Sequence, residues 1–347
     1  MRRAGAVCLA GAIAVAVAIG AHLTAAGADQ PAPDRIRLAI NKETYANLPL
    51  FVAVDNGYFQ QQNLDVVLVP YTGSSITQLP FLARGEIDIT EIAPAPGLFN
   101  LPTEGFNVKI IASLSGAHGG WNGTSWLMVR QDLWDAKTIR KPADLRGMHL
   151  DVAAAGAPTD LLAHEVIRQA GLTTADVNVT AAVRTPPNWY TSLRNHAVDV
   201  QAAVEPTATE IEREGLAHKW LSYSDGVPWF QDVYLAASPG YDRDHHDAVR
   251  RFLIAYLQAA RDIDRAGPTW SPKLAAEVAK WTQLPLATIM QVPGPAYTGG
   301  LGAVNRASLD RVQAYWVSQG LVKTTAPLND ILDLSALNEA RKALRIR

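Results

Sequence analysis

Cysteine is almost missing from this sequence of 347 residues: its one cysteine is Cys8. Cys8 lies inside an apolar, alanine-rich run, Ala4–Ala21, and precedes most of that run. This position argues against a lipid-attachment cysteine, which would follow the run. If the run is removed, the remaining chain has no disulfide, no thiol nucleophile and no cysteine ligand for a metal. An exported chain without disulfides is more typical of a bacterial envelope than of a small disulfide-stapled domain.

The N-terminus has the pattern of a secretory signal peptide. Arg2 and Arg3 precede the apolar run, and Ala26-Gly27-Ala28 offers small residues at a cleavage site. We therefore expect residues 1–28 to be a cleaved signal peptide. A retained membrane anchor is the alternative, because the run is near the lower length for a membrane span. No other segment is long and apolar enough to cross a bilayer.

The chain also lacks an excess of basic residues. Its formal charge is −2, and loss of Arg2 and Arg3 with the leader takes that charge to −4. Such a balance gives no electrostatic footprint for nucleic acid or for anionic lipid.

Three common catalytic motifs are absent from the sequence: a Gly-x-Ser-x-Gly elbow, a Walker phosphate loop and a His-Glu-x-x-His zinc motif. We expect a protein that is not an enzyme and that needs no cofactor and no metal. A hydrolase using scattered carboxylates remains an alternative.

What the sequence does have is a regular alternation of strands and helices, seen most clearly from Gly57 to Pro96. The expected order is strand, polar turn, helix, strand and proline-rich exit, at Leu64–Val69, Thr72–Ser75, Ile76–Arg84, Ile87–Ile92 and Ala93–Pro96. This alternation predicts a parallel sheet. Ligands of such sheets bind outside the carboxyl ends of the strands, where both turns would lie.

A second stretch, Leu145–Pro206, repeats this pattern. Asp88 aligns with Asp199, and each follows a helix and precedes a strand that runs to a proline loop. Further strands are expected at Ile36–Ile40, Val108–Ala112, Ser125–Arg130, Met148–Ala153, Val177–Ala182, Val198–Val204 and Val233–Ala237, and helices at Leu48–Asn56, Asp160–Ala170, Trp189–Asn195, Asp244–Arg265, Asn305–Gln319 and Ser335–Leu344, with one more beginning at Ser271. The repeat predicts two α/β lobes that share a cleft.

Several short motifs, in this order and spacing, resemble the substrate-binding proteins of nitrate/sulfonate/taurine-type ABC importers. They are Gly57-Tyr58-Phe59, Leu82–Asp88, Pro142–Gly147, Gly171-Leu172 with Asp176-Val177, Ala197-Val198-Asp199 and Glu205-Pro206. The resemblance covers roughly residues 35 to 265. It implies a type II periplasmic-binding-protein fold, an α/β fold of two lobes with a hinge and a central cleft, and with crossovers near Gly116–Thr124 and Asp225–Trp229.

On this basis the predicted domain organisation has four parts. Residues 1–28 are the signal peptide, 29–120 the first part of lobe 1, 121–226 lobe 2, and 227–347 the return to lobe 1 with C-terminal helices packed on it. The resemblance further implies a monomeric solute receptor in the periplasm that delivers a small molecule to an ABC permease and ATPase. The protein would be at the cell surface or secreted if the host lacks an outer membrane.

The resemblance also covers enzymes of the same fold. Sulfinate desulfinases use a catalytic cysteine, which the chain beyond residue 28 does not have. Thiamine-pyrimidine synthases are cytosolic and carry a cysteine-rich segment, which is absent here.

Two turns are candidate anion sites, because backbone N–H groups at a helix N-terminus bind negative charge. One comprises Gly73, Ser74 and Ser75, and the other runs from Gly156 through Ala157 to Thr159. Plain helix capping is the alternative for both.

The remaining candidates differ in the solute polarity that they favour. Arg184 would hold a sulfonate or carboxylate, whereas Glu205 would accept from an amine or a heterocycle; they also have the alternative of pairing with each other. The other candidate ligand-binding residues are Asn41, Tyr45, Ala93, Pro94, His118, Trp121, Trp189 and Trp229. We expect an organic anion or zwitterion, with a neutral or cationic heterocycle such as a pyrimidine as the alternative.

Overall fold

The structure is a computed structural model that describes residues 31–115, 125–181, 185–266, 269–294 and 301–346. The chain divides into two compact units, Met1–Pro33 and Asp34–Arg347, and the fold below is that of the second. Within the described residues, no helix is long and apolar enough to span a membrane.

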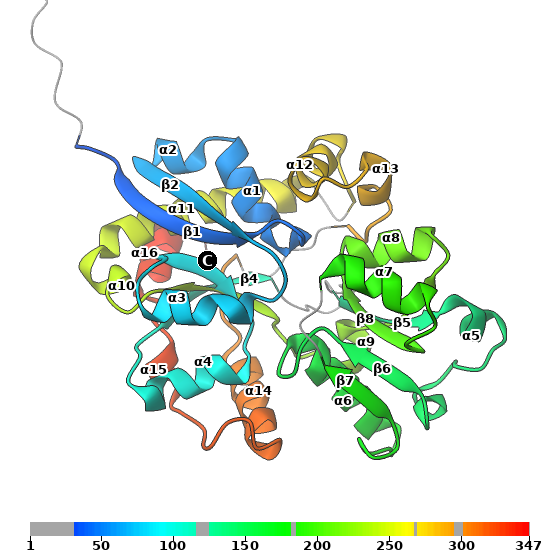
Figure 1. Cartoon of the computed structure of the whole chain (residues 1–347). Coiled ribbons are helices and arrows are strands. Elements are labelled where there is room, and N and C mark those ends of the chain that lie inside the picture. The colour runs from blue at the N-terminus through cyan, green and yellow to red at the C-terminus, as the bar shows by residue number, and fades with distance from the viewer. Residues whose placement is uncertain (1–30, 116–124, 182–184, 267–268, 295–300, 347) are drawn as a thin grey trace, which may run out of the picture. The chain divides into compact units, whose positions relative to one another are not determined.

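The first sheet has five strands in the order β2-β1-β3-β10-β4 (Figure 1). Their bounds are β1 Asp34–Asn41, β2 Leu64–Tyr71, β3 Ile89–Ile92, β4 Lys109–Ser115 and β10 Val233–Ala237. β1 pairs in parallel with β2 and β3, whereas β10 is antiparallel to both β3 and β4.

The second sheet also has five strands, in the order β7-β6-β8-β5-β9. Their bounds are β5 Ser125–Arg130, β6 His149–Val152, β7 Asn178–Ala181, β8 Val200–Val204 and β9 Ala217–Ser222. β6 pairs in parallel with β7 and β8, and β5 is antiparallel to β8 and β9. The two sheets therefore have the same topology, as the sequence repeat predicts.

The parallel arrangement predicted from Gly57 to Pro96 is confirmed, because β2 and β3 both pair in parallel with β1. Each sheet also contains one antiparallel strand that the sequence did not predict. β5 and β10 are the first strands after the chain changes sheets, between β4 and β5 and between β9 and β10. The preceding strand ends at the cavity edge of its own sheet, and the chain crosses there to the facing edge of the other sheet. The new strand therefore starts at the edge where the parallel strands of that sheet end, and it runs antiparallel to them. The sequence analysis also missed β9, the edge strand of the second sheet.

Helices flank both sheets. In the first part of the chain they are η1 Tyr45–Asn47, α1 Leu48–Asp55, α2 Tyr58–Gln61, η2 Ser75–Gln78, α3 Leu79–Ala83, α4 Pro96–Asn100 and η3 Leu101–Glu104. Around the second sheet they are α5 Gln131–Asp135, η4 Pro142–Leu145, α6 Pro158–Gln169, α7 Pro186–Arg194, α8 Thr207–Arg213 and α9 Tyr223–Gly226. The helix expected over Ile76–Arg84 is split into η2 and α3, with Pro80 in the first turn of α3.

The C-terminal helices pack mainly against the first sheet and its helices, as predicted. They are α10 Tyr241–Asp244, α11 His246–Ala266, α12 Pro272–Thr282, α13 Leu286–Ile289, α14 Arg306–Ser318, α15 Leu328–Ile331 and α16 Ser335–Ala343. α11 is amphipathic and buries its apolar face against α1, α2 and α16 (Figure 1). In α14, Trp316 Nε1 donates to the carbonyl of Pro94 at 2.9 Å. Two of them also contact helices of the second sheet: α13 packs on α8 as well as on α12, and Tyr315 of α14 hydrogen-bonds His164 of α6.

Candidate functional site

A cavity lies where strand ends of the two sheets meet, and it leaves about 140 Å³ for the centres of water-sized atoms. Its described lining comes from both sheets: Asn41, Glu43, Thr44, Ala46, Tyr71, Gly73, Ser74, Ser75, Glu91, Ala93, Ser125, Ala153, Ala157, Pro158, Thr159, Pro186, Trp189, Val204, Tyr223, Asp232 and Val233. The parallel strands contribute their carboxyl ends, and β5 and β10 contribute their first residues. This is the edge at which α/β sheets bind ligands.

On the first-sheet side, Asn41 ties two loops together. Its Nδ2 donates to the carbonyl of Gly73 at 2.8 Å, and its Oδ1 accepts the backbone N–H of Glu43 at 2.8 Å. Glu43 Oε2 in turn accepts the backbone N–H of Gly73 at 2.9 Å. Both polar atoms of the Asn41 side chain are therefore engaged within the protein, and Asn41 fixes the shape of this wall.

Glu91 is a buried acid at the end region of β3, with a relative exposure of 3%. Its Oε1 accepts three hydrogen bonds: from the backbone N–H of Asn41 at 3.0 Å, from Asn47 Nδ2 at 3.0 Å and from the hydroxyl of Tyr71. Its Oε2 is buried and has no hydrogen-bond partner in the described structure. Burial raises the pKa of Glu91 to about 7, against the lowering effect of these three donors.

On the second-sheet side, the turn before α6 is closed by its own side chains. The N–H of Gly156 donates to Asp160 Oδ2 at 2.8 Å, and the N–H of Ala153 donates to Thr159 Oγ1 at 3.4 Å. Burial raises the pKa of Asp160, while the Gly156 N–H and His164 act to lower it. Gly156 has φ +75°, and a Cβ there would lie 2.7 Å from Cδ of Pro96, so the two halves touch at this turn.

Aromatic side chains form part of the cavity wall. Trp189 of α7 is 4% exposed, and its buried Nε1 has no hydrogen-bond partner in the part of the chain that the structure describes. Tyr223 of α9 is fully enclosed and packs edge-on against Phe230 at 5.2 Å between ring centroids. Burial is the main reason why the pKa values of Tyr71 and Tyr223 lie well above the usual range. Both hydroxyls therefore keep their protons at neutral pH.

Another acid of the cavity lining is Asp232, in the segment that leads into β10. Asp232 is 2% exposed, and its Oδ1 accepts from Ser115 Oγ at 3.0 Å. No lysine, arginine or histidine is present among the described lining residues. Among all the residues that the structure describes, no group of His, Cys, Asp or Glu side chains is arranged to hold a metal ion.

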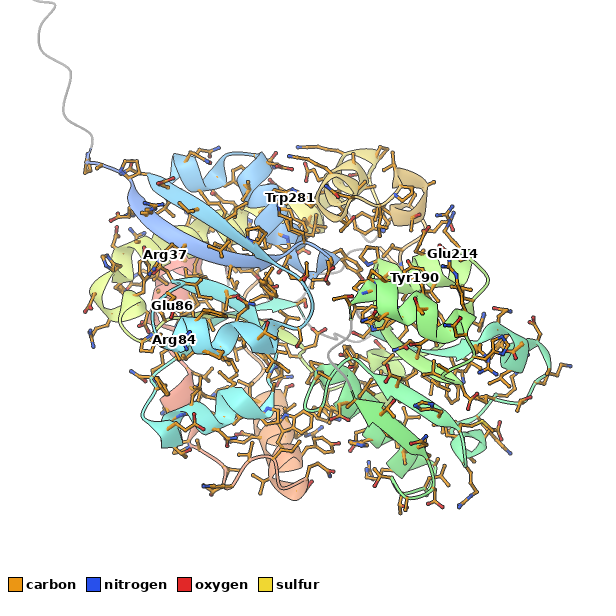
Figure 2. The ribbon with its side chains drawn as sticks, in the orientation of Figure 1. Arg37, Arg84, Glu86, Tyr190, Glu214 and Trp281 are labelled. Atoms are coloured by element: carbon orange, nitrogen blue, oxygen red, sulfur yellow. The ribbon has the colours of Figure 1, made fainter. Side chains whose placement is uncertain are left out.

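An outer groove adjoins the cavity and shares Glu43 and Pro186 with it. Tyr190 of α7 and Glu214 at the end of α8 lie close together on its second-sheet side (Figure 2). Arg194 forms an ion pair with Glu214, and its guanidinium lies 5.8 Å from the ring centroid of Tyr190. The one basic side chain of the described groove is thus already paired.

A sequence profile described as NMT1/THI5 like matches residues 45–265, well over half of the chain. The chain belongs to the NMT1/THI5-like family. The matched part includes β2 to β10, the cavity walls that these strands carry, and most of α11. A comparison of the sequence with curated proteins gives no match.

Solved structures show the fold of this NMT1/THI5-like chain. It is similar to the periplasmic aliphatic sulphonate binding protein SsuA from Escherichia coli, with a TM-score of 0.68, 17% identity, and coverage of 87% of this chain and 92% of that one. It is also similar to the periplasmic nitrate-binding protein NrtA from Synechocystis PCC 6803, with a TM-score of 0.72, 12% identity, and coverage of 91% of this chain and 90% of that one. The resemblance and the periplasmic-binding-protein fold inferred from sequence are confirmed.

An enzyme shares this fold. The desulfurization enzyme DSZB matches with a TM-score of 0.63, 16% identity, and coverage of 90% of this chain and 100% of that one. The fold of an NMT1/THI5-like chain therefore does not by itself separate binding from catalysis.

Half of the site residues predicted from the sequence line the cavity. They are Asn41, Gly73, Ser74, Ser75, Ala93, Ala157, Thr159 and Trp189. Contact of these residues with a ligand stays a prediction.

Three other predicted residues serve the packing of the first sheet or the contact between the halves. Tyr45 is fully buried, 5.9 Å edge-on from Trp270. The carbonyl of Pro94 accepts from Trp316, and Gly156 packs against Pro96. None of the three lines the cavity, because each is covered by neighbouring side chains.

Glu205 and Trp229 also lie outside the cavity lining. Glu205 has no exposed side-chain surface; its Oε1 is 2.7 Å from Lys219 Nζ, and its Oε2 accepts the N–H and the hydroxyl of Thr209 at 3.1 and 2.8 Å. It therefore caps α8 and pairs with Lys219 rather than with a solute. Trp229 is half-buried, with the guanidinium of Arg311 5.4 Å from its ring centroid.

His118, Trp121 and Arg184 lie outside the described residues, as do the predicted signal peptide and the first crossover. The alternative pairing of Arg184 with Glu205 is not needed to balance Glu205, which has Lys219.

The two turns expected to bind an anion have few donors left for one. At the first turn, the N–H of Gly73 binds Glu43 and the N–H of Ile76 binds Ser74 Oγ at 3.4 Å. The following η2 is a single short 3₁₀ turn. At the second turn, Asp160 takes the N–H of Gly156. Ser74 therefore caps η2, as the alternative interpretation of the first turn holds. α6 has no side-chain cap at Ala157, and the contacts of the second turn come from Thr159 and Asp160 within the helix.

The sequence analysis missed the acids and aromatics that distinguish this cavity: Glu43, Tyr71, Glu91, Tyr223 and Asp232. Glu91 did leave a signal. It lies inside the expected strand Ile87–Ile92, between Thr90 and Ile92, and a charged residue inside a buried strand is rare unless it has a specific role.

Proposed function

We propose that this chain is the exported solute-binding component of an ABC importer. It holds one small organic solute in the cavity between the two sheets and delivers it to a membrane permease and its ATPase. The observation that carries this proposal is the cavity itself, whose walls come from strand ends of both sheets. Because the described strands change sheets only twice, a small rotation of one sheet relative to the other would open and close such a cavity.

The family and the structural neighbours support this proposal. Two of the neighbours are periplasmic binding proteins for a sulphonate and for nitrate. The proposal includes the cleaved signal peptide, a location in the periplasm and action as a monomer. We expect the solute to be an organic compound small enough to be enclosed, as ligand sites of this kind bury most of the ligand surface.

Binding without turnover tests the receptor against an enzyme of the same fold. Purified protein is screened against small sulfonates, carboxylates, amines and heterocycles by thermal shift and tryptophan fluorescence. Each bound compound is then incubated with the protein and analysed by mass spectrometry. The receptor predicts at least one compound that is bound and recovered unchanged. Chemical conversion of a bound compound would show that the protein is an enzyme.

A transport assay tests the partner. Deletion of the gene should abolish uptake of the identified solute, and its return should restore it. Uptake that is unchanged by the deletion would contradict the proposed role in import.

A further inference from the structure

The charge of the cavity wall points to one class of solute. The described lining carries three carboxyl side chains, Glu43, Glu91 and Asp232, and no basic side chain. Glu43 and Asp232 each accept a hydrogen bond from the protein, from Gly73 and Ser115. An anion placed among three carboxylates is repelled, and this repulsion is strong where water is excluded.

Glu91 provides the most specific evidence. A carboxylate offers about four acceptor positions, and its two oxygens here are used very unequally. Three protein donors converge on Oε1, whereas Oε2 is buried and has no partner among the described residues. A buried acceptor without a donor is costly, so it is rarely left in a folded protein without a purpose. No described residue supplies a donor for Oε2, and the adjoining cavity is where a solute would supply it.

The walls around Glu91 also fit a cation with a flat or apolar body. The cavity includes the rings of Tyr71, Trp189 and Tyr223. Aromatic faces attract organic cations, and tryptophan does so most strongly. The free Nε1 of Trp189 adds one donor for a polar atom elsewhere on the solute.

We infer that the solute of this protein is a small organic cation, a protonated amine or an amidinium, whose N–H group donates to Glu91 Oε2. This inference rests on the proposed solute-binding function and narrows it to one charge class. It departs from the organic anion or zwitterion expected from the sequence, because the described lining offers no cationic partner for the negative group of either.

Benzamidine and benzoate test the charge class directly. They share a phenyl ring and a planar three-atom head group, but they carry opposite charges near neutral pH. Binding of each to the full chain is measured by calorimetry and by tryptophan fluorescence. We expect benzamidine to bind and benzoate to bind at least about tenfold more weakly. Preferred binding of benzoate would overturn the cation inference and leave the receptor function standing.

Glu91→Gln tests the contact itself. The amide keeps one oxygen for the three protein donors and replaces the acceptor at Oε2 by a donor. We expect the affinity for benzamidine to fall roughly tenfold to a hundredfold, the usual effect of losing a hydrogen bond to a charged group. Glu205→Gln is the matched control, since it neutralises an equally buried acid away from the cavity and should leave the affinity unchanged. Loss of binding in Glu205→Gln but not in Glu91→Gln would overturn the inference.

A pH series separates the contact from a general loss of structure. Burial holds the pKa of Glu91 near 7, so a cation must displace its proton at lower pH. Tyr71, Tyr223, Glu43 and Asp232 are the other titratable groups of the described wall, and the raised pKa values of the two tyrosines keep them protonated throughout. Benzamidine stays charged over this range. Its affinity should therefore rise about tenfold between pH 6 and pH 8 in the native protein.

The same affinity should stay nearly constant with pH in Glu91→Gln. An equal pH dependence in both proteins would contradict the role of Glu91. If neither benzamidine nor benzoate binds, the cation inference fails; if no member of the wider solute panel binds either, the proposed receptor function fails with it.

Discussion

The two sheets are built alike at their starts and differently at their ends. Before β3, the backbone N–H of Asp88 donates to the carbonyl of Arg37, and the Asp88 side chain accepts the backbone N–H of Arg37 at 2.6 Å. Before β8, Asp199 does the same with His149 at 2.9 Å. Arginine side chains bind both aspartates: Arg37 in the first sheet, which is labelled in Figure 2, and Arg130 in the second.

At the other end of these strands the correspondence stops. The first sheet carries Glu91, with one oxygen fully used and the other unpartnered. Counting from the paired aspartates, the second sheet has Ala202 at that position. Its buried acid, Glu205, is three residues further on and is neutralised by Lys219. The repeated features build the frame, and the site arises where the two halves differ.

Removing the cation that pairs with Glu205 should have the largest effect. Lys219→Met leaves Glu205 as a buried charge without its ion pair, at a cost of about 3–5 kcal/mol in the free energy of unfolding. Denaturant titration measures this. Adding Glu205→Gln to the variant should recover most of the loss. A decrease in unfolding free energy of less than about 1 kcal/mol would mean that the ion pair with Lys219 does not stabilise Glu205, and the contrast with Glu91 would fail.

Glu91→Gln should raise the free energy of unfolding relative to the native protein, and only at higher pH, where Glu91 is ionised. The folded-state pKa of Glu91, about 7, lies above its usual value of 4.5, so its contribution to stability is complete at low pH and is lost as the pH rises through 7. The variant removes this dependence. The fall in unfolding free energy from pH 5 to pH 8 should be smaller by about 2.5 kcal/mol than in the native protein. An identical fall in both proteins would show that Glu91 does not carry it.

Asp88→Asn and Asp199→Asn test the part of the comparison that is shared. Each change weakens a charge-assisted acceptor of a backbone N–H and of an arginine, so each should destabilise the protein by about 1–2 kcal/mol. Asp88 should show the larger value, because its side chain is 5% exposed against 25% for Asp199. Thermal unfolding of the two variants side by side checks this order, and opposite signs would break the correspondence.

The smallest contrast is between two glycines of the cavity turns. Gly73 and Gly156 have φ +78° and +75°, so alanine is strained at both, at about 1 kcal/mol. A Cβ on Gly73 meets nothing within 4 Å, whereas one on Gly156 is 2.7 Å from Pro96 Cδ. Gly156→Ala should therefore cost at least about 1 kcal/mol more than Gly73→Ala. Equal decreases in unfolding free energy for the two variants would mean that Pro96 shifts away from the new Cβ without destabilising the fold.

Much of the fold was predictable because it depends on local patterns. Apolar runs of four to eight residues placed most strands, and helical spacing placed α6 and α11. The Asp88 and Asp199 motifs revealed the repeat. β9 was missed because Ala217–Ser222 is a half-buried edge strand with polar residues in it. The direction of β5 and β10 was missed because it depends on how the chain crosses between sheets.

The sequence by itself determined the two-fold α/β repeat, the lack of a cysteine beyond residue 28 and the turns at Gly73 and Gly156, since each depends on neighbours along the chain. Only the tertiary structure decided which acid faces the cavity and which is neutralised. Lys219 reaches Glu205 from β9, whereas no basic side chain among the described residues reaches Glu91, whose partners on β1, η1 and β2 bind only one of its oxygens. The pairing of buried charges is a property of strands that meet in space, and local sequence carries no record of it.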